Sequence, residues 1–250
     1  MHKILKQKVE KKQEYLNGLK RGRFLNLPEN KMAIIAEIKM ASPTVPYFES
    51  EKNIVKRAVD YKQAGVDAIS IITEKHFFKG SPKFIPRIKK SVDLPVLQKD
   101  FVIDSYQIYE AKIIGANALL LITKITDKQT LIKFVLLCQE IGIEPIVEIS
   151  DEIDLKKALQ TSTKIIAVNA RNLETFDVNV DQACRLMEKI PDRFVKLGFS
   201  GIKSSNEVKK YQRAGAKGIL VGTSLMKTNN IKSFIRELQN YESQSKNLRN

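Results

Sequence analysis

The sequence is poor in cysteine, histidine and tryptophan, and this scarcity argues against several kinds of site. Its 250 residues include two cysteines, two histidines and no tryptophan. Cys138 and Cys184 lie far apart and form no CxxC pair, so we expect no disulfide framework and no zinc site, but two buried structural thiols. His2 and His76 do not form a metal cluster with ordinary ligand spacing, and a Ser-His-Asp triad would depend on His76 alone.

Long apolar runs are also missing. The longest, around Ala118 to Ile122, has the length of a strand, whereas a membrane-spanning helix needs roughly 20 apolar residues. Residues 1–8 show no signal-like apolar stretch, so we expect a cytoplasmic protein with no membrane partner. No GxGxxG motif follows the first predicted strand, which argues against a dinucleotide-binding fold.

Positive charge is abundant but is spread along the whole chain. The chain has 43 Lys and Arg against 28 Asp and Glu, a net charge of +15. The basic residues recur on the polar sides of amphipathic segments, for example at Lys52, Lys56 and Arg57, and at Lys209 and Lys210. Because they do not cluster, we favour a solvated surface over a nucleic-acid interface. The excess charge should still attract an anionic metabolite, an effect that salt would weaken.

Short β-like runs alternate with helical segments, which predicts successive βα units. Most runs are continuously apolar, as expected for a parallel sheet covered on both faces. AGVDAISII, IGANALLLI and AGAKGILVG, which begin at Ala64, Ile114 and Ala214, form a weak internal repeat. The eight predicted strands are 33–38, 68–72, 95–98, 118–122, 144–148, 165–168, 194–198 and 218–221.

We therefore predict a single-domain (β/α)8 TIM barrel spanning residues 1–250. The apolar pattern of the first 20 residues predicts an extra N-terminal helix within a helical extension over 1–30. A polar tail is expected over 239–250. An open doubly wound sheet is the alternative architecture.

Polar residues collect where the predicted strands end, and that end of a parallel barrel carries the active site. Glu37 and Lys39 are two residues apart and so share one side of their strand. Each residue alone fits a solvated charge, but six such strand ends together favour a common site in which neighbouring charges alter pKa values. The candidate acid–base and polar residues are Glu37, Lys39, Lys99, Glu148, Asn169 and Arg171.

The ends of the last two predicted strands suggest an anion site. Barrels often bind phosphate there through backbone N–H groups and a short helix N-terminus. Ser200-Gly201 and Gly222-Thr223 fit this role, and Ser42 lies in the loop after the first strand. In the alternative interpretation, Gly222 only ends the strand and Thr223 caps the next helix. Phe78 and Phe101 either form a pocket for a flat ring or belong to the core.

Five segments point to one family. They read IIAEIKMASP, GVDAISIITEKHFFKGS, PVLQKDFVIDSYQIYEAKIIGANALLLI, AVNARNLETFDVN and ILVGTSLM. In this order they resemble indole-3-glycerol phosphate synthase from about Met32 to Met226. The resemblance implies conversion of 1-(2-carboxyphenylamino)-1-deoxyribulose 5-phosphate to indole-3-glycerol phosphate with loss of CO2 and water, in tryptophan biosynthesis, without cofactor or metal.

The resemblance also implies roles for individual residues. Lys99 would be the general acid, Lys39 would share the acid and electrostatic work, and Glu148 would be the general base. Glu37 and Asn169 would hold the lysines and the substrate hydroxyls. The substrate and phosphate sites would be lined by Ser42, Ser200, Gly201, Gly222 and Thr223.

The chain departs from the family pattern in three places. Phe199 stands where the family usually has a glutamate before Ser-Gly, residues 44–47 read Thr-Val-Pro-Tyr in place of a small residue and Lys-Gly, and the N-terminal extension is shorter. We expect retained chemistry with weaker turnover or altered substrate binding. Another phosphosugar barrel enzyme, such as a pathway isomerase, and a non-catalytic barrel remain alternatives. A monomer is expected, with association with another tryptophan-pathway enzyme left open.

Overall fold

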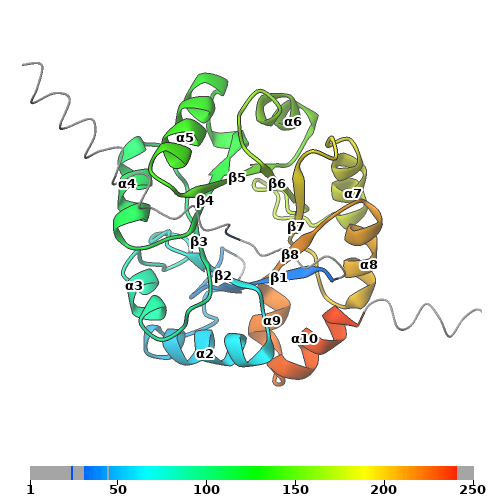
Figure 1. Cartoon of the computed structure of the whole chain (residues 1–250). Helices are drawn as coiled ribbons and strands as arrows, with labels where there is room; N and C mark the ends of the chain where they lie inside the picture. The colour runs from blue at the N-terminus through cyan, green and yellow to red at the C-terminus, as the bar shows by residue number, and fades with distance from the viewer. Residues whose placement is uncertain (1–23, 25–30, 44, 241–250) are drawn as a thin grey trace, which may run out of the picture.

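The structure is a computed structural model that describes residues 24, 31–43 and 45–240. Eight parallel strands pair each with the next, and β8 closes the sheet against β1 (Figure 1). The predicted (β/α)8 barrel is therefore confirmed. The strands are β1 (Ala33–Ile38), β2 (Ala68–Ile72), β3 (Val96–Lys99), β4 (Ala118–Ile122), β5 (Glu144–Ile149), β6 (Ile165–Asn169), β7 (Val195–Phe199) and β8 (Gly218–Val221).

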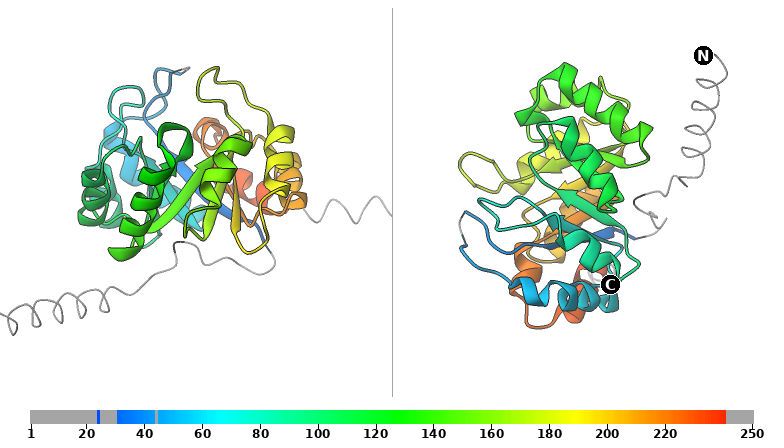
Figure 2. Two further views of the ribbon diagram at one scale, coloured as in Figure 1. Left: turned by 90° about the horizontal axis from the view of Figure 1, so that it is seen from above. Right: turned by 90° about the vertical axis from the view of Figure 1, so that its left-hand side faces the viewer.

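Helices surround the barrel on the outside, and the loops after β1, β2 and β6 extend toward one end of it (Figures 1 and 2). Asp104 and Ser204 start two of these helices with capping boxes, which satisfy backbone N–H groups that a helix start leaves unpaired. The helical elements are η1 (Glu51–Asn53), α2 (Ile54–Ala64), α3 (Phe84–Lys89), α4 (Ser105–Ile113), η2 (Thr123–Ile125), α5 (Lys128–Glu140), α6 (Glu152–Ala158), α7 (Val180–Glu188), α8 (Ser205–Arg213), α9 (Thr223–Lys227) and α10 (Ile231–Gln239).

Four of the eight predicted strands have the observed bounds, and the other four differ by one residue at one or both ends. The prediction for β7 ended at Gly198, whereas the strand continues to Phe199. The predicted N-terminal extension lies outside the described residues apart from Phe24, which packs inside the barrel. Of the predicted polar tail, Gln239 and Asn240 are described, and Gln239 is the last residue of α10. These domain boundaries stay predictions.

The core has two parts, one between the sheet and the helices and one inside the barrel. Cys138 is buried in the outer part, as predicted. The prediction for Cys184 was wrong, because this side chain packs against the outer core but is only partly buried. Within the described ranges, no helix is both long and apolar enough to cross a bilayer.

The strand register arranges the inward side chains in layers. In a barrel of this kind, side chains from alternate strands share one height because each strand is displaced along its neighbour. Starting at Glu37, we move to the paired residue on the next strand, go one residue forward along that strand, and repeat. This path passes through Lys99, Glu148 and Phe199 and returns to Glu37. These four residues, from β1, β3, β5 and β7, form one layer at the mouth, which we call the charged layer. Lys99 and Phe199 face each other across it.

Candidate active site

A cavity of about 330 Å³ opens at the carboxyl ends of the strands. All of the predicted site residues line it except Glu148 and Phe101. The residues that the sequence predicted and the structure places on the cavity wall are Glu37, Lys39, Ser42, Phe78, Lys99, Asn169, Arg171, Ser200, Gly201, Gly222 and Thr223. Residues from six of the eight strands or their following loops therefore meet around one space.

Glu37 and Lys39 form a buried ion pair at the first strand end. Lys39 Nζ lies 3.1 Å from Glu37 Oε1 and donates a hydrogen bond of 2.9 Å to Thr223 Oγ1. Burial acts to raise the pKa of Glu37, but the charges of Lys39 and Lys99 outweigh it and hold that pKa below its usual value. Glu37 is therefore a fixed negative charge, and its lysine partner is held toward the β8 end.

Glu148 does not line the cavity, and its environment differs from that of Glu37. Its Oε1 accepts a hydrogen bond of 3.1 Å from Asn169 Nδ2, and its Oε2 has no hydrogen-bond partner among the described residues. Burial raises the pKa of Glu148, and the attraction of Lys99 and the Asn169 hydrogen bond offset this only in part. The pKa values of two carboxyl groups of one layer are thus moved in opposite directions, which is the arrangement that separates an acid from a base.

Lys99 is the cation of the charged layer. Its charge acts to lower the pKa of both Glu37 and Glu148, and the strand register places all three residues in one layer. Its ammonium group makes no hydrogen bond or ion pair with any other residue in the described part of the chain. The adjacent Asp100 is held away, because it accepts hydrogen bonds of 2.5 Å from Thr73 Oγ1 and 2.8 Å from the Phe101 N–H. Lys99 is therefore available to a ligand in the cavity.

The β7 and β8 ends bring glycine and hydroxyl groups to the wall. Ser200 and Gly201 both have left-handed backbone conformations, with φ of 69° and 80°. Ser200 Oγ donates a hydrogen bond of 2.8 Å to Asn169 Oδ1. The short helix α9 begins at Thr223, directly after Gly222, as the phosphate-site prediction requires. A side chain at Gly222 would overlap Glu37 Oε1, so this glycine also makes room for the buried ion pair.

The loop after β2 supplies an apolar wall. Phe78 lines the cavity, and Phe101 lies behind it with the two ring centres 6.5 Å apart. Sequence reasoning missed Glu74, whose carboxylate accepts hydrogen bonds from the N–H groups of His76, Phe77 and Phe78 at 2.6, 2.8 and 2.9 Å. The acidic residue directly before this exposed segment was the available signal. His76 is exposed and does not line the cavity, so the triad alternative receives no support.

Phe199 completes the charged layer with an apolar ring. It is buried, lines the cavity and packs in the core inside the barrel. Tyr211 donates to the carbonyl oxygens of Phe199 and Ser200 at 3.1 Å each, which fixes the strand end behind the ring. Leu173 and Leu220 extend the apolar part of the wall. These apolar wall residues were missed because, in sequence, they look like ordinary core.

The closed barrel and its cavity of ammonium, carboxyl, hydroxyl and apolar groups define a (β/α)8-barrel enzyme. Comparison with known proteins identifies which one. A model of the family described as indole-3-glycerol phosphate synthase matches residues 3–238, and the chain belongs to this family.

Curated relatives agree. The indole-3-glycerol phosphate synthase of Caldanaerobacter subterraneus subsp. tengcongensis is 41% identical over 94% of this chain and 95% of its own length. The synthase of Nautilia profundicola is 41% identical over 85% of this chain and 82% of its own length. Among solved structures, 3-hexulose-6-phosphate synthase superposes with a TM-score of 0.66 over 84% of this chain and 99% of its own, at 16% identity, a likeness of fold alone.

Proposed function

We propose that this chain converts 1-(2-carboxyphenylamino)-1-deoxyribulose 5-phosphate to indole-3-glycerol phosphate, the reaction implied by its family. The observation that carries the proposal is the charged layer, in which Glu37 and Lys99 line the cavity and Glu148 belongs to the same layer, each from a different strand. Membership of the family indicates which reaction to expect, and the charged layer contains the ammonium and carboxyl groups that the reaction needs for proton transfer.

Lys99 is assigned the first proton transfer. When the ring carbon that bears the carboxylate attacks the substrate carbonyl, a carbon–carbon bond forms and the carbonyl oxygen takes up a proton. The ammonium group of Lys99 lines the cavity and has no hydrogen-bond or ion-pair partner among the described residues, so it is free to donate that proton. Loss of CO2 then leaves its electron pair in the ring and restores aromaticity.

Glu148 and the second lysine are assigned the loss of water. The new hydroxyl group receives a proton from Lys39 and leaves as water, and a neighbouring carbon loses a proton to Glu148 to form the double bond of indole. The raised pKa of Glu148 makes its carboxylate a better proton acceptor than an ordinary one. Lys39, held by Glu37 and Thr223, stabilises negative charge on the substrate oxygens.

The phosphate is assigned to the β7 and β8 ends. Ser42, Ser200, Gly201, Gly222 and Thr223 offer hydroxyl or backbone donors on this part of the wall, and Arg171 and Lys203 add positive charge. Phe78, with Phe101 behind it, is assigned to the aromatic ring. These steps use protein side chains for every proton, so the proposal invokes no cofactor or metal.

The direct test is to incubate the purified protein with the substrate and follow indole fluorescence. Product formation that Lys99→Met removes supports the proposal. Tight binding of the phosphoester without product favours another phosphosugar enzyme, and salt-sensitive retention of RNA without phosphoester binding favours a binding protein. A monomeric, cytoplasmic enzyme remains our prediction, as does a possible association with another tryptophan-pathway enzyme, and gel filtration tests the monomer.

A further inference from the structure

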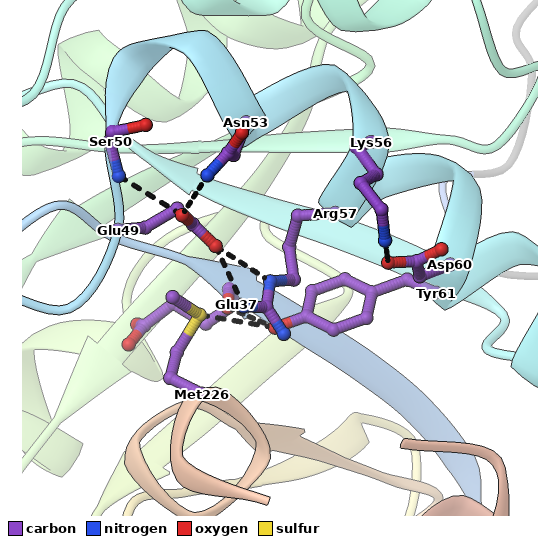
Figure 3. Close-up of polar contacts among 9 residues, drawn as sticks. All are labelled: Glu37, Glu49, Ser50, Asn53, Lys56, Arg57, Asp60, Tyr61 and Met226. Atoms are coloured by element: carbon purple, nitrogen blue, oxygen red, sulfur yellow. Dashed lines mark hydrogen bonds and ion pairs between the residues drawn. The ribbon is translucent and has the colours of Figure 1, made fainter. Parts of the chain in front are cut away.

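A buried carboxylate outside the cavity is fully hydrogen-bonded by its surroundings. Glu49 follows the loop after β1 and does not line the cavity. Its Oε2 accepts from Arg57 Nε and Nη2 at 3.0 and 2.7 Å, and its Oε1 accepts from the Ser50 N–H and Asn53 Nδ2 at 3.0 and 3.1 Å (Figure 3). Burial acts to raise the pKa of Glu49, but the Arg57 and Ser50 hydrogen bonds outweigh it and lower that pKa.

Arg57 therefore differs from the solvated basic residues with which its sequence pattern grouped it. Its side chain is 19% exposed, whereas that of the preceding Lys56 is 76% exposed and pairs with Asp60 at 2.8 Å on the same helix. Two donors of one guanidinium group contact one carboxylate, a planar arrangement that lysine cannot reproduce. Removing one partner of such a buried pair leaves the other charge without compensation.

This ion pair fixes the end of the loop that begins at Lys39. The N–H groups of Phe48 and Glu49 both donate to the carbonyl oxygen of Met40, at 2.7 and 3.4 Å, which closes the loop at its base. The Phe48 ring lies against Lys39, with Nζ 4.9 Å from the ring centre. Helix α2 also contacts the end of β1 directly, because Tyr61 donates a hydrogen bond of 3.2 Å to the Glu37 carbonyl oxygen (Figure 3).

Three groups surround the Lys39 ammonium: Glu37, Thr223 and the Phe48 ring. Glu37 belongs to β1, and Thr223 begins α9 two residues after the end of β8, so elements of the barrel hold both of them. Phe48 lies on a loop, and its neighbour Glu49 is the residue that ties this loop end to α2. The position of the Phe48 ring, the third group around the Lys39 ammonium, thus depends on an ion pair outside the cavity.

We propose that the Arg57–Glu49 ion pair is a positioning device for Lys39, acting by holding the Phe48 ring against its ammonium group. The inference rests on the proposed function, in which Lys39 stabilises charge on the substrate. Neither Arg57 nor Glu49 touches the reacting atoms. Their effect on the reaction passes through Lys39 and disappears when Lys39 is absent.

A double-mutant cycle on the full chain tests this dependence. Arg57→Met is measured in the wild-type background and in the Lys39→Gln background, with indole formation giving kcat and KM. We expect Arg57→Met to lower kcat on the order of tenfold, as removal of an outer orienting partner does at metal sites, with KM changed less than about threefold. In the Lys39→Gln background it should lower kcat less than about twofold. Equal losses in the two backgrounds would overturn the proposal.

Two companion variants separate positioning from general damage. Lys56→Gln breaks the exposed ion pair on the same helix and should leave kcat unchanged. Arg57→Lys keeps the charge but loses the two-donor contact, so it should recover only part of the kcat that Arg57→Met loses. If Arg57→Met does not fold, Asn53→Ala removes one neutral hydrogen bond from Glu49 and enters the same cycle in its place.

Failure of the proposed function would be visible separately. A wild-type protein that forms no indole product contradicts the assigned reaction but leaves the cycle intact, because the same four proteins can be compared by their Kd for the phosphorylated substrate. Coupling between positions 57 and 39 in Kd supports the positioning role. Independent, additive effects on Kd contradict it.

Discussion

Replacing Lys99 by methionine removes the ammonium group of the charged layer and keeps a side chain of similar length. In the structure this group faces Phe199 across the layer and lies near Glu37 and Glu148. Proton donation by a positioned side chain accelerates a reaction by about 10² to 10⁴-fold. We expect kcat/KM of Lys99→Met to fall by that factor, which corresponds to roughly 3 to 5.5 kcal/mol in the barrier.

The fold should tolerate this substitution. Glu37 keeps its partner Lys39 at 3.1 Å, and Glu148 can take up a proton because burial already raises its pKa. No hydrogen bond to another described residue is lost. We expect the free energy of unfolding to change by about 1 kcal/mol, the usual size for a single substitution.

Indole fluorescence measures the rate, and thermal unfolding followed by circular dichroism measures the stability. A folded variant that retains more than a tenth of the wild-type kcat/KM would refute the role given to Lys99. A variant that unfolds by several kcal/mol would instead contradict the inference that Glu148 absorbs the change by protonation.

Three further substitutions test the rest of the site. Glu148→Gln should lower kcat by about 10² to 10⁴-fold. Because burial raises the pKa of Glu148, its contribution to stability is present below the ordinary carboxyl pKa and is lost as pH rises through the raised value. The melting temperature of Glu148→Gln relative to wild type should therefore increase as the pH rises above the ordinary carboxyl pKa. Phe199→Glu should raise kcat above that of the neutral control Phe199→Gln, while both lose up to about 3 kcal/mol of stability through lost ring packing; equal rates would show that the missing carboxylate is not limiting. Gly222→Ala places a methyl group onto Glu37 Oε1 and should cost about 1 to 3 kcal/mol in denaturant unfolding and reduce kcat, whereas unchanged kinetics would mean that the Glu37–Lys39 pair is not needed in this geometry.

The sequence predicted the strands well because a strand enclosed on both faces is a continuous apolar run. The ends were less well predicted, since one residue more or less changes no periodic pattern. The missing residue was important at β7. Because Phe199 belongs to the strand, its ring points into the barrel, in the same layer as Lys99. The inward direction of Glu37, Lys99 and Glu148 follows from the same period of two, so the polar site was accessible from strand ends alone.

Contacts between distant segments were not accessible in this way. The amide cluster around Glu74 and the ion pair between Glu49 and Arg57 depend on how a loop folds back on a neighbouring element. In the sequence, Arg57 stands beside an exposed Lys56, and composition gives no reason to treat them differently. Burial of one and not the other is decided by where the Glu49 carboxylate lies, which is a property of the tertiary structure.

The two lysines predicted to act in the reaction both line the cavity, and they differ in which protein groups surround their ammonium groups. Lys39 has a carboxylate, a hydroxyl group and an aromatic ring around its ammonium, so its position is fixed before a ligand arrives. Lys39 pairs with the Glu37 carboxylate, so Lys99 forms no ion pair with Glu37, although its charge acts on the pKa of Glu37. An enzyme that must both hold an anionic substrate and donate a proton gains from this division, since a fixed charge orients without reorganising and an unpaired one can move with the reacting oxygen.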